Sequence, residues 1–145
     1  MHPYPHLYIA AASGRQEGTI ALKSADLPEI PTAAPPEFDG PGGVWSPETL
    51  LCASIADCFV LSFRAIARAS KLDWSELTCR VEGTLERVDG VSQFTKFKTF
   101  ASLVVPAESA AESARRLLEK AERVCLVSNS LRGERTLVAD VVLAG

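Results

Sequence analysis

The sequence is poor in several residues and patterns that mark specialised sites. Its 145 residues hold only two histidines, His2 and His6, and both lie in a short N-terminal stretch interrupted by prolines. No CxxC or CxxH pair occurs, which argues against a zinc site. Lysine and arginine form no run, and the net charge is −3. A nucleic acid or an anionic membrane is therefore not expected as the main partner.

The N-terminus also lacks a positively charged region followed by a long apolar run, so it does not read as a signal peptide. The most apolar window, residues 49–65, contains Asp57 and Arg64 and falls short of the roughly 20 uncharged residues of a membrane span. We therefore expect a cytoplasmic protein. In that reducing compartment the four cysteines are expected to be thiols with packing or chemical roles.

The first part of the chain predicts a hairpin followed by a loop. Residues 6–12 and 18–24 have the composition of short strands, and the turn "SGRQEG" between them places Arg15 near its tip. Residues 26–43 contain five prolines and three glycines, which predicts a loop that no helix or strand occupies. The length and composition are those of a single globular domain over residues 1–145.

A long helix is predicted from Ser46 to about Ser70. Serine at the N-cap, then Pro47 and Glu48, form a strong start signal. The segment "SPETLLCASIADCFVLSF" is apolar nearly all round, so the helix must be buried on several sides. We expect it to be the central helix of something larger than a two-layer monomer.

The second half of the chain alternates between strands and a helix. Together with the first half, the predicted order is ββ-α-ββ-α-β, an α+β arrangement with antiparallel pairing. The predicted elements are strands at 76–88 and 94–105, a helix at 107–124, a loop at 128–133 and a final strand at 134–143.

The predicted elements limit the roles of three of the four cysteines. Cys79 lies on the apolar face of its predicted strand, where cysteine behaves as a small hydrophobic residue, so we interpret it as structural. Cys52 and Cys58 are about 240° apart around a helix, so they can neither form a disulfide with each other nor share a metal ion.

Cys58 and Cys125 each lie on the inward stripe of a predicted helix, and the two stripes could face each other. Buried cysteines are usually inert, and a reactive one needs a cation that stabilises its thiolate. Arg15 is a candidate for this cation, and Glu48 could hold its guanidinium by a two-pronged contact. Both also have ordinary roles, as a solvated turn residue and as a first-turn glutamate favoured by the helix dipole. The residues alone leave both interpretations open.

Four segments together resemble the OsmC/Ohr family, the osmotically inducible protein C and organic hydroperoxide resistance proteins. "GPGGVWSPETLLCASIADCF" is similar to the family's helix entry, where a Pro-Glu-x-Leu start precedes a cysteine followed by phenylalanine. "FTKFKTFASLVVP" is similar to its long second-half strand, and "AERVCLVSNSL" to the segment with its second cysteine. "SGRQEG" is similar to its first hairpin turn, which carries an arginine. The four segments occur in the family's order.

The resemblance implies a fold and a set of site residues. The fold is an intertwined homodimer, with antiparallel sheets wrapped around central buried helices and active sites at the subunit interface. Cys58 takes the place of the cysteine that attacks peroxide, and Cys125 that of the resolving cysteine. Arg15 matches the arginine that activates the thiolate and orients the hydroperoxide. Glu48 matches the glutamate that positions this arginine.

The activity that the resemblance implies is a thiol-dependent peroxidase, which reduces organic hydroperoxides in oxidative stress defence. Oxidation of Cys58 gives a sulfenic acid, and Cys125 condenses with it to a disulfide. An external dithiol, often a lipoylated protein in this family, then reduces the disulfide by exchange. No metal, flavin or haem cofactor is expected.

The chain departs from the family pattern at two positions. Leu126 stands where proline usually follows the second cysteine, and Asp57 replaces the small residue common before the first. A carboxylate close to a thiolate opposes its ionisation. The departures motivate an alternative, a non-catalytic dimeric module of the same fold that binds a small hydrophobic ligand. The proline-rich segment before the helix further resembles a less characterised branch of the superfamily.

Overall fold

The computed structural model describes all 145 residues, which divide into two compact units, residues 1–50 and 51–145. The first unit is built on a small antiparallel sheet with strand order β1-β2-β3. Its strands are β1 (Ala11–Ser13), β2 (Ile20–Lys23) and β3 (Ile30–Thr32). The predicted hairpin is confirmed, since Ala11 pairs with Lys23 and Ser13 with Ala21. Residues 6–10 lie outside any strand. Strand β2 ends at Lys23, which pairs with Ala11, so the residues before Ala11 have no strand residue opposite them.

The prediction that residues 26–43 hold no strand or helix was wrong. They contain β3 and a short 3-10 helix, η1 (Pro36–Phe38). A strand can form there because β3 is the edge strand of its sheet, where proline is tolerated. Ile30 and Thr32 flank Pro31 and pair with Leu22 and Ile20 of β2.

Helix α1 (Pro47–Ala69) begins where the sequence predicted. The backbone N–H of Thr49 donates to the Ser46 hydroxyl at 3.2 Å, and the Ser46 N–H donates back to the Thr49 hydroxyl at 3.0 Å. This reciprocal arrangement satisfies N–H groups that lack a partner at the start of a helix.

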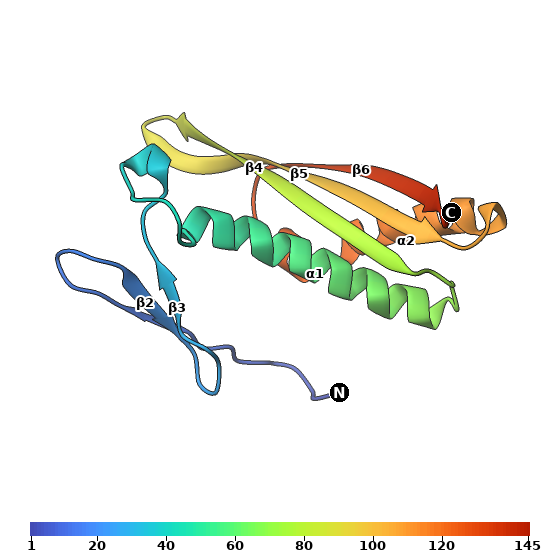
Figure 1. The fold of residues 1–145 in the computed structure, drawn as a ribbon, viewed down its shortest axis with the longest axis horizontal. Helices are drawn as coiled ribbons and strands as arrows, with labels where there is room; N and C mark the ends of the chain where they lie inside the picture. The colour runs from blue at the N-terminus through green and yellow to red at the C-terminus, as the bar shows by residue number, and fades with distance from the viewer. The chain divides into compact units, whose positions relative to one another are not determined.

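The second unit contains a sheet with strand order β4-β5-β6 (Figure 1). Its strands are β4 (Glu76–Val88), β5 (Val91–Val105) and β6 (Glu134–Leu143). Strands β4 and β5 pair antiparallel through a tight turn, but β5 and β6 pair parallel, so the prediction of purely antiparallel pairing was wrong. The parallel pair is possible because a helical crossover lies between β5 and β6, as a parallel connection requires.

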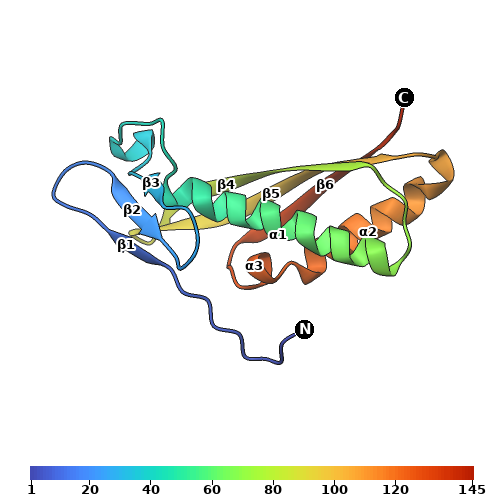
Figure 2. The same ribbon diagram turned by 60° about the horizontal axis from the view of Figure 1, so that its bottom comes forward.

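The crossover consists of a 3-10 turn, η2 (Glu108–Ala110), and helices α2 (Ala111–Val124) and α3 (Leu126–Asn129). Helix α3 occupies part of the predicted loop at 128–133, so that loop is shorter than expected. Helices α1 and α2 both pack on the inward face of β5 (Figures 1 and 2). Their shared core consists of Phe59, Phe63, Ala67, Ala101, Leu103, Val105, Ala114, Leu118 and Ala121.

The apolar helix α1 is buried on one face only within a single chain. Ile55, Phe59, Phe63 and Ala67 are buried, whereas Leu61 is 51% exposed. By length and composition α1 is also apolar enough to cross a membrane, a test that core helices of soluble proteins pass as well. The expectation of burial on several sides is therefore not met inside one chain. The apolar flank of α1 around Leu61 stays exposed.

Candidate active site

Cys58 lies in the middle of α1, at the wall of a cavity of about 480 Å³. Residues of α1 and the start of α3 line this cavity, and Figure 2 shows α3 beside the middle of α1. The thiol is partly exposed, so a small molecule that enters the cavity can reach it. The lining residues are Ser54, Asp57, Cys58, Leu61, Ser62, Leu126 and Val127.

Cys125 lies at the junction of α2 and α3 and is fully buried. Its extended backbone, with φ −60° and ψ 106°, ends one helix and begins the next. The chain therefore bends sharply at this residue. The bend turns the Cys125 thiol toward Cys58, and the two side chains are close enough to hydrogen-bond. Both remain free thiols.

The surroundings of Cys58 favour its ionised form. Burial alone raises the pKa of the Cys58 thiol, but hydrogen bonds to the sulfur outweigh it, so the pKa is lowered. The largest of these comes from the backbone N–H of Val127, followed by the thiol of Cys125, the hydroxyl of Ser62 and the N–H of Leu126. The Ser62 hydroxyl lies one helical turn away, 3.9 Å from the Cys58 sulfur. Cys58 is thus the more nucleophilic of the two thiols.

The pKa of Cys125 shifts in the opposite direction. Burial raises it most, the hydroxyl and backbone N–H of Ser128 lower it in part, and the contact with Cys58 raises it further. Cys125 therefore keeps its proton and can donate it to the Cys58 thiolate. Cys58 is thus the more readily ionised thiol, and Cys125 lies beside it in protonated form.

The two remaining cysteines have different environments. Burial, the charge of Glu122 and the charge of Cys125 raise the pKa of Cys79 to about 12, so it stays protonated. Burial also raises the pKa of Cys52, against a backbone hydrogen bond from Gly83. High pKa values make both thiols poor nucleophiles, which agrees with the structural role predicted for Cys79.

The other two predicted site residues belong to the first compact unit, whereas Cys58 and Cys125 belong to the second. Arg15 is exposed in the β1–β2 turn, where it lines a shallow polar cavity with Ser13, Gly14, Glu17 and Thr19. Glu48 lies in the first turn of α1, and one oxygen of its carboxylate is buried without a hydrogen-bond partner in the chain. The roles of Arg15 and Glu48 stay predictions.

The sequence analysis missed three groups that act on the Cys58 sulfur. Ser62 could have been found, because it follows Cys58 by four residues and so shares its helix face. The N–H groups of Leu126 and Val127 could not, since only the bend at Cys125 turns them toward α1. Asp57 lines the cavity, yet it is not among the groups that shift the pKa of Cys58.

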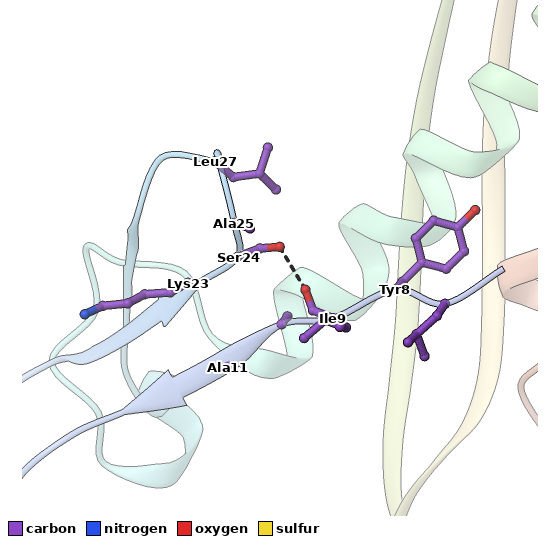
Figure 3. A pocket seen from close by; sticks show the side chains of 9 residues that line it. Tyr8, Ile9, Ala11, Lys23, Ser24, Ala25 and Leu27 are labelled. Atoms are coloured by element: carbon purple, nitrogen blue, oxygen red, sulfur yellow. Dashed lines mark hydrogen bonds between the residues drawn. The ribbon is translucent and has the colours of Figure 1, made fainter.

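A second, larger cavity of about 720 Å³ lies in the first unit. Figure 3 shows its walls, formed by the chain before β1 and the loop after β2, with the Ser24 hydroxyl donating to the Ile9 carbonyl at 2.8 Å. Leu7, Tyr8 and Leu27 give it an apolar lining. It contains no cysteine, histidine or carboxylate, so it lacks the reactive groups of the Cys58 cavity.

Comparison with known proteins adds a family context to this geometry. The family model described as OsmC-like protein matches residues 40–138. An organic hydroperoxide resistance protein of Xanthomonas axonopodis pv. citri (strain 306) is 32% identical over 86% of this chain and 85% of its own length. Uncharacterized protein YmaD of Bacillus subtilis (strain 168) is 28% identical over 97% of both chains.

Solved structures share the fold. An OsmC-like protein of unknown function from Vibrio cholerae superposes with a TM-score of 0.83 at 15% identity, over 93% of this chain and 99% of that one. An organic hydroperoxide resistance protein from Legionella pneumophila superposes with a TM-score of 0.73 at 28% identity, over 95% and 99%. The predicted α+β fold class is confirmed, with the differences in β3, α3 and the β5–β6 pairing given above.

Proposed function

The chain belongs to the OsmC-like protein family, and we propose that it is a thiol-dependent peroxidase that reduces organic hydroperoxides. In this proposal Cys58 is the nucleophile and Cys125 the resolving thiol. The observation that carries the proposal is the contact between these two thiols, with the pKa of one lowered and that of the other raised. The curated relatives named for organic hydroperoxide resistance support the substrate class.

The first step is attack of the Cys58 thiolate on the outer oxygen of the hydroperoxide. The O–O bond breaks, the alkoxide leaves and takes up a proton to become an alcohol, and Cys58 becomes a sulfenic acid. The hydrogen bonds from Val127, Leu126 and Ser62 lower the pKa of the Cys58 thiol and so increase the fraction present as thiolate. The apolar side chains of Leu61 and Leu126 in the cavity favour an alkyl group over water.

The second step joins the two sulfurs. Once Cys58 has lost its negative charge, it no longer raises the pKa of Cys125, and the Ser128 hydroxyl and N–H remain to stabilise a Cys125 thiolate. The Cys125 sulfur then attacks the sulfenic sulfur, the S–O bond breaks and water leaves. An external dithiol, such as a lipoylated protein, reduces the disulfide by exchange and restores both thiols.

Arg15 and Glu48 complete the proposed site. Buried polar atoms nearly always have a hydrogen-bond partner, so the buried carboxylate oxygen of Glu48 calls for a donor. We assign this donor to the guanidinium of Arg15, from the same chain or a second copy, where it would also stabilise the Cys58 thiolate. Arginine suits this role because its planar fork matches a carboxylate.

The proposal includes a homodimer in which both units of each chain form one OsmC-like domain. The exposed flank of α1 around Leu61 supports it, because an apolar helix face is stable only when covered. We place the protein in the cytoplasm, where dithiol reductants regenerate thiols.

Rapid-mixing kinetics with cumene hydroperoxide test the proposal. The wild-type protein should react much faster than free cysteine and lose two of its four thiols. Cys58→Ser should abolish the fast reaction, while Cys52→Ser, a matched change on the same helix, should leave it intact. A wild-type rate no higher than that of free cysteine would refute the peroxidase.

The apolar cavity of the first unit favours a second candidate function, binding of a small hydrophobic ligand without catalysis. Leu7, Tyr8 and Leu27 line that cavity and are largely exposed. This candidate predicts that Cys58→Ser binds an apolar fluorescent probe as tightly as wild type, and that Leu27→Asp abolishes the binding. A peroxide reaction at the speed proposed above would exclude the non-catalytic reading.

A further inference from the structure

Arg135 is a charged residue on the inward face of β6. Along this strand Arg135, Leu137, Ala139 and Val141 are partly buried, whereas the residues between them are exposed. A cation on an apolar face must find hydrogen-bond partners. Arg135 finds them on both sides of Cys125.

The guanidinium of Arg135 makes three hydrogen bonds. Its Nε donates to the Glu122 carboxylate at 2.8 Å, a terminal nitrogen donates to the Asn129 side-chain oxygen at 2.8 Å, and the other donates to the Glu122 backbone carbonyl. The Asn129 amide in turn donates to the backbone carbonyl of Arg123 at 3.1 Å. Arg135 thus connects the last turn of α2 directly to the last residue of α3.

These bonds stabilise the bend at Cys125. The last carbonyls of a helix have no partner within it, and a cation near them is favoured by the helix dipole. Arg135 and Asn129 satisfy the carbonyls of Glu122 and Arg123, which precede Cys125 by three and two residues. Helix α2 can therefore end before Cys125 while the carbonyls of its last turn still accept hydrogen bonds.

This ion pair is the most buried of the protein. The side chains of Arg135 and Glu122 are 27% and 15% exposed, whereas both partners of every other pair are more than half exposed. Burial reduces screening by water and salt, so this pair restrains its surroundings more than an exposed one. The backbone just before β6 requires glycine at position 133. Its φ is +113°, and a Cβ added there would lie 3.0 Å from the Thr95 carbonyl oxygen.

We propose that Arg135 is a positioning residue for Cys125, holding the α2–α3 bend so that the Cys125 thiol stays against Cys58. It thereby sets the rate at which the disulfide closes. In that step the S–S bond forms, the S–O bond of the Cys58 sulfenic acid breaks, and the oxygen leaves as water with the Cys125 proton. The chemistry rests on the proposed function, but the placement of the two thiols does not.

The test separates the two chemical steps. Arg135→Gln should slow formation of the Cys58 sulfenic acid from cumene hydroperoxide less than it slows disulfide closure, because Ser62 still donates to the Cys58 sulfur when the bend loosens. A sulfenic-acid trap in quenched samples measures the first step. Disulfide closure should slow about 10- to 100-fold, because displacing reacting atoms by about 1 Å costs a rate factor of that order. The matched control is Arg116→Gln, which breaks the exposed Arg116–Glu112 pair on α2 and should change neither step.

A measurement without peroxide distinguishes failure of this inference from failure of the proposed function. In glutathione redox buffers, Arg135→Gln should shift the Cys58–Cys125 equilibrium toward the free thiols, and Arg116→Gln should not. Should Arg135→Gln fail to fold, Asn129→Ala removes the two hydrogen bonds of the Asn129 side chain, leaves the Arg135–Glu122 ion pair, and should slow closure less. Unchanged closure and an unchanged redox equilibrium in either folded variant would overturn the proposal, whatever the peroxide reactivity.

Discussion

The thiol of Cys125 lies beside that of Cys58, although Cys58 belongs to α1, Cys125 joins α2 to α3, and the β4–β5 hairpin separates them in the sequence. Burial raises the pKa of both thiols, yet hydrogen bonds lower that of Cys58 while the shared contact raises that of Cys125. This asymmetry assigns the nucleophile and the resolving thiol in the proposed cycle.

The pH dependence of Cys58 reactivity provides a first prediction. Its thiolate fraction, and so its alkylation rate, should rise with pH and reach half-maximum below the pH found for free cysteine, because its pKa is lowered. Ser62→Ala removes one donor to the sulfur and should move this midpoint upward, which slows the reaction at neutral pH. Ser54→Ala, in the same cavity but not among those donors, should leave the midpoint in place. Iodoacetamide kinetics resolve the two variants, and equal shifts would contradict the assignment.

Cys79 should be chemically silent in the folded protein. Burial, Glu122 and Cys125 raise its pKa to about 12, so almost no thiolate exists at physiological pH. In mass-spectrometric mapping of alkylation at pH 8, Cys58 should be modified first and Cys79 only on unfolding. Cys79→Ala should keep the wild-type rate of peroxide attack. Modification of Cys79 ahead of Cys58 would show that these electrostatics are wrong.

Gly83 of β4 should tolerate no side chain. A Cβ there would lie 2.8 Å from the Cys52 sulfur and 2.9 Å from a ring carbon of Phe94. Gly83→Ala should lower the free energy of unfolding by about 1–3 kcal/mol, the usual cost of overpacking. Adding Cys52→Ala removes one of the two contacts and should restore part of that loss in denaturant titrations. A Gly83→Ala variant as stable as wild type would contradict the packing described.

The proposed guanidinium contact predicts a graded loss of peroxide attack. Arg15→Gln should slow sulfenic-acid formation about 10²- to 10³-fold, the usual effect of removing one donor that stabilises charge at a reacting centre. Glu48→Gln should cost less, because the arginine remains. Glu17→Gln, in the same turn as Arg15, is the control and should be neutral. If Arg15→Gln reacts at the wild-type rate, the arginine has no part in catalysis.

Much of the fold could be predicted because its long elements have regular patterns. The start of α1 followed from Ser46 and Pro47, and β4 and β6 lie where alternation placed them. Alternation shows which face a residue occupies but not the direction of the neighbouring strand, so the parallel β5–β6 pairing was missed. The four residues of α3 are too few for a helical period, and proline content hid β3 because edge strands accept proline.

The candidate site could be predicted only in part, for a related reason. The inward stripes of two helices indicated that Cys58 and Cys125 could meet, but the bend that brings them together depends on Arg135 and Asn129, which are distant in sequence from Cys58. The available signal was a charged residue at an inward position of β6, since Arg135 shares the face of Leu137 and Ala139. Only tertiary contacts reveal that its partners flank Cys125.

The most direct measurement is peptide mapping of the protein after reaction with one equivalent of cumene hydroperoxide. The account predicts that a disulfide between Cys58 and Cys125 forms within the first turnover, while Cys52 and Cys79 remain thiols. If Cys58 stays reduced, or if its disulfide partner is any residue other than Cys125, the central claim is contradicted.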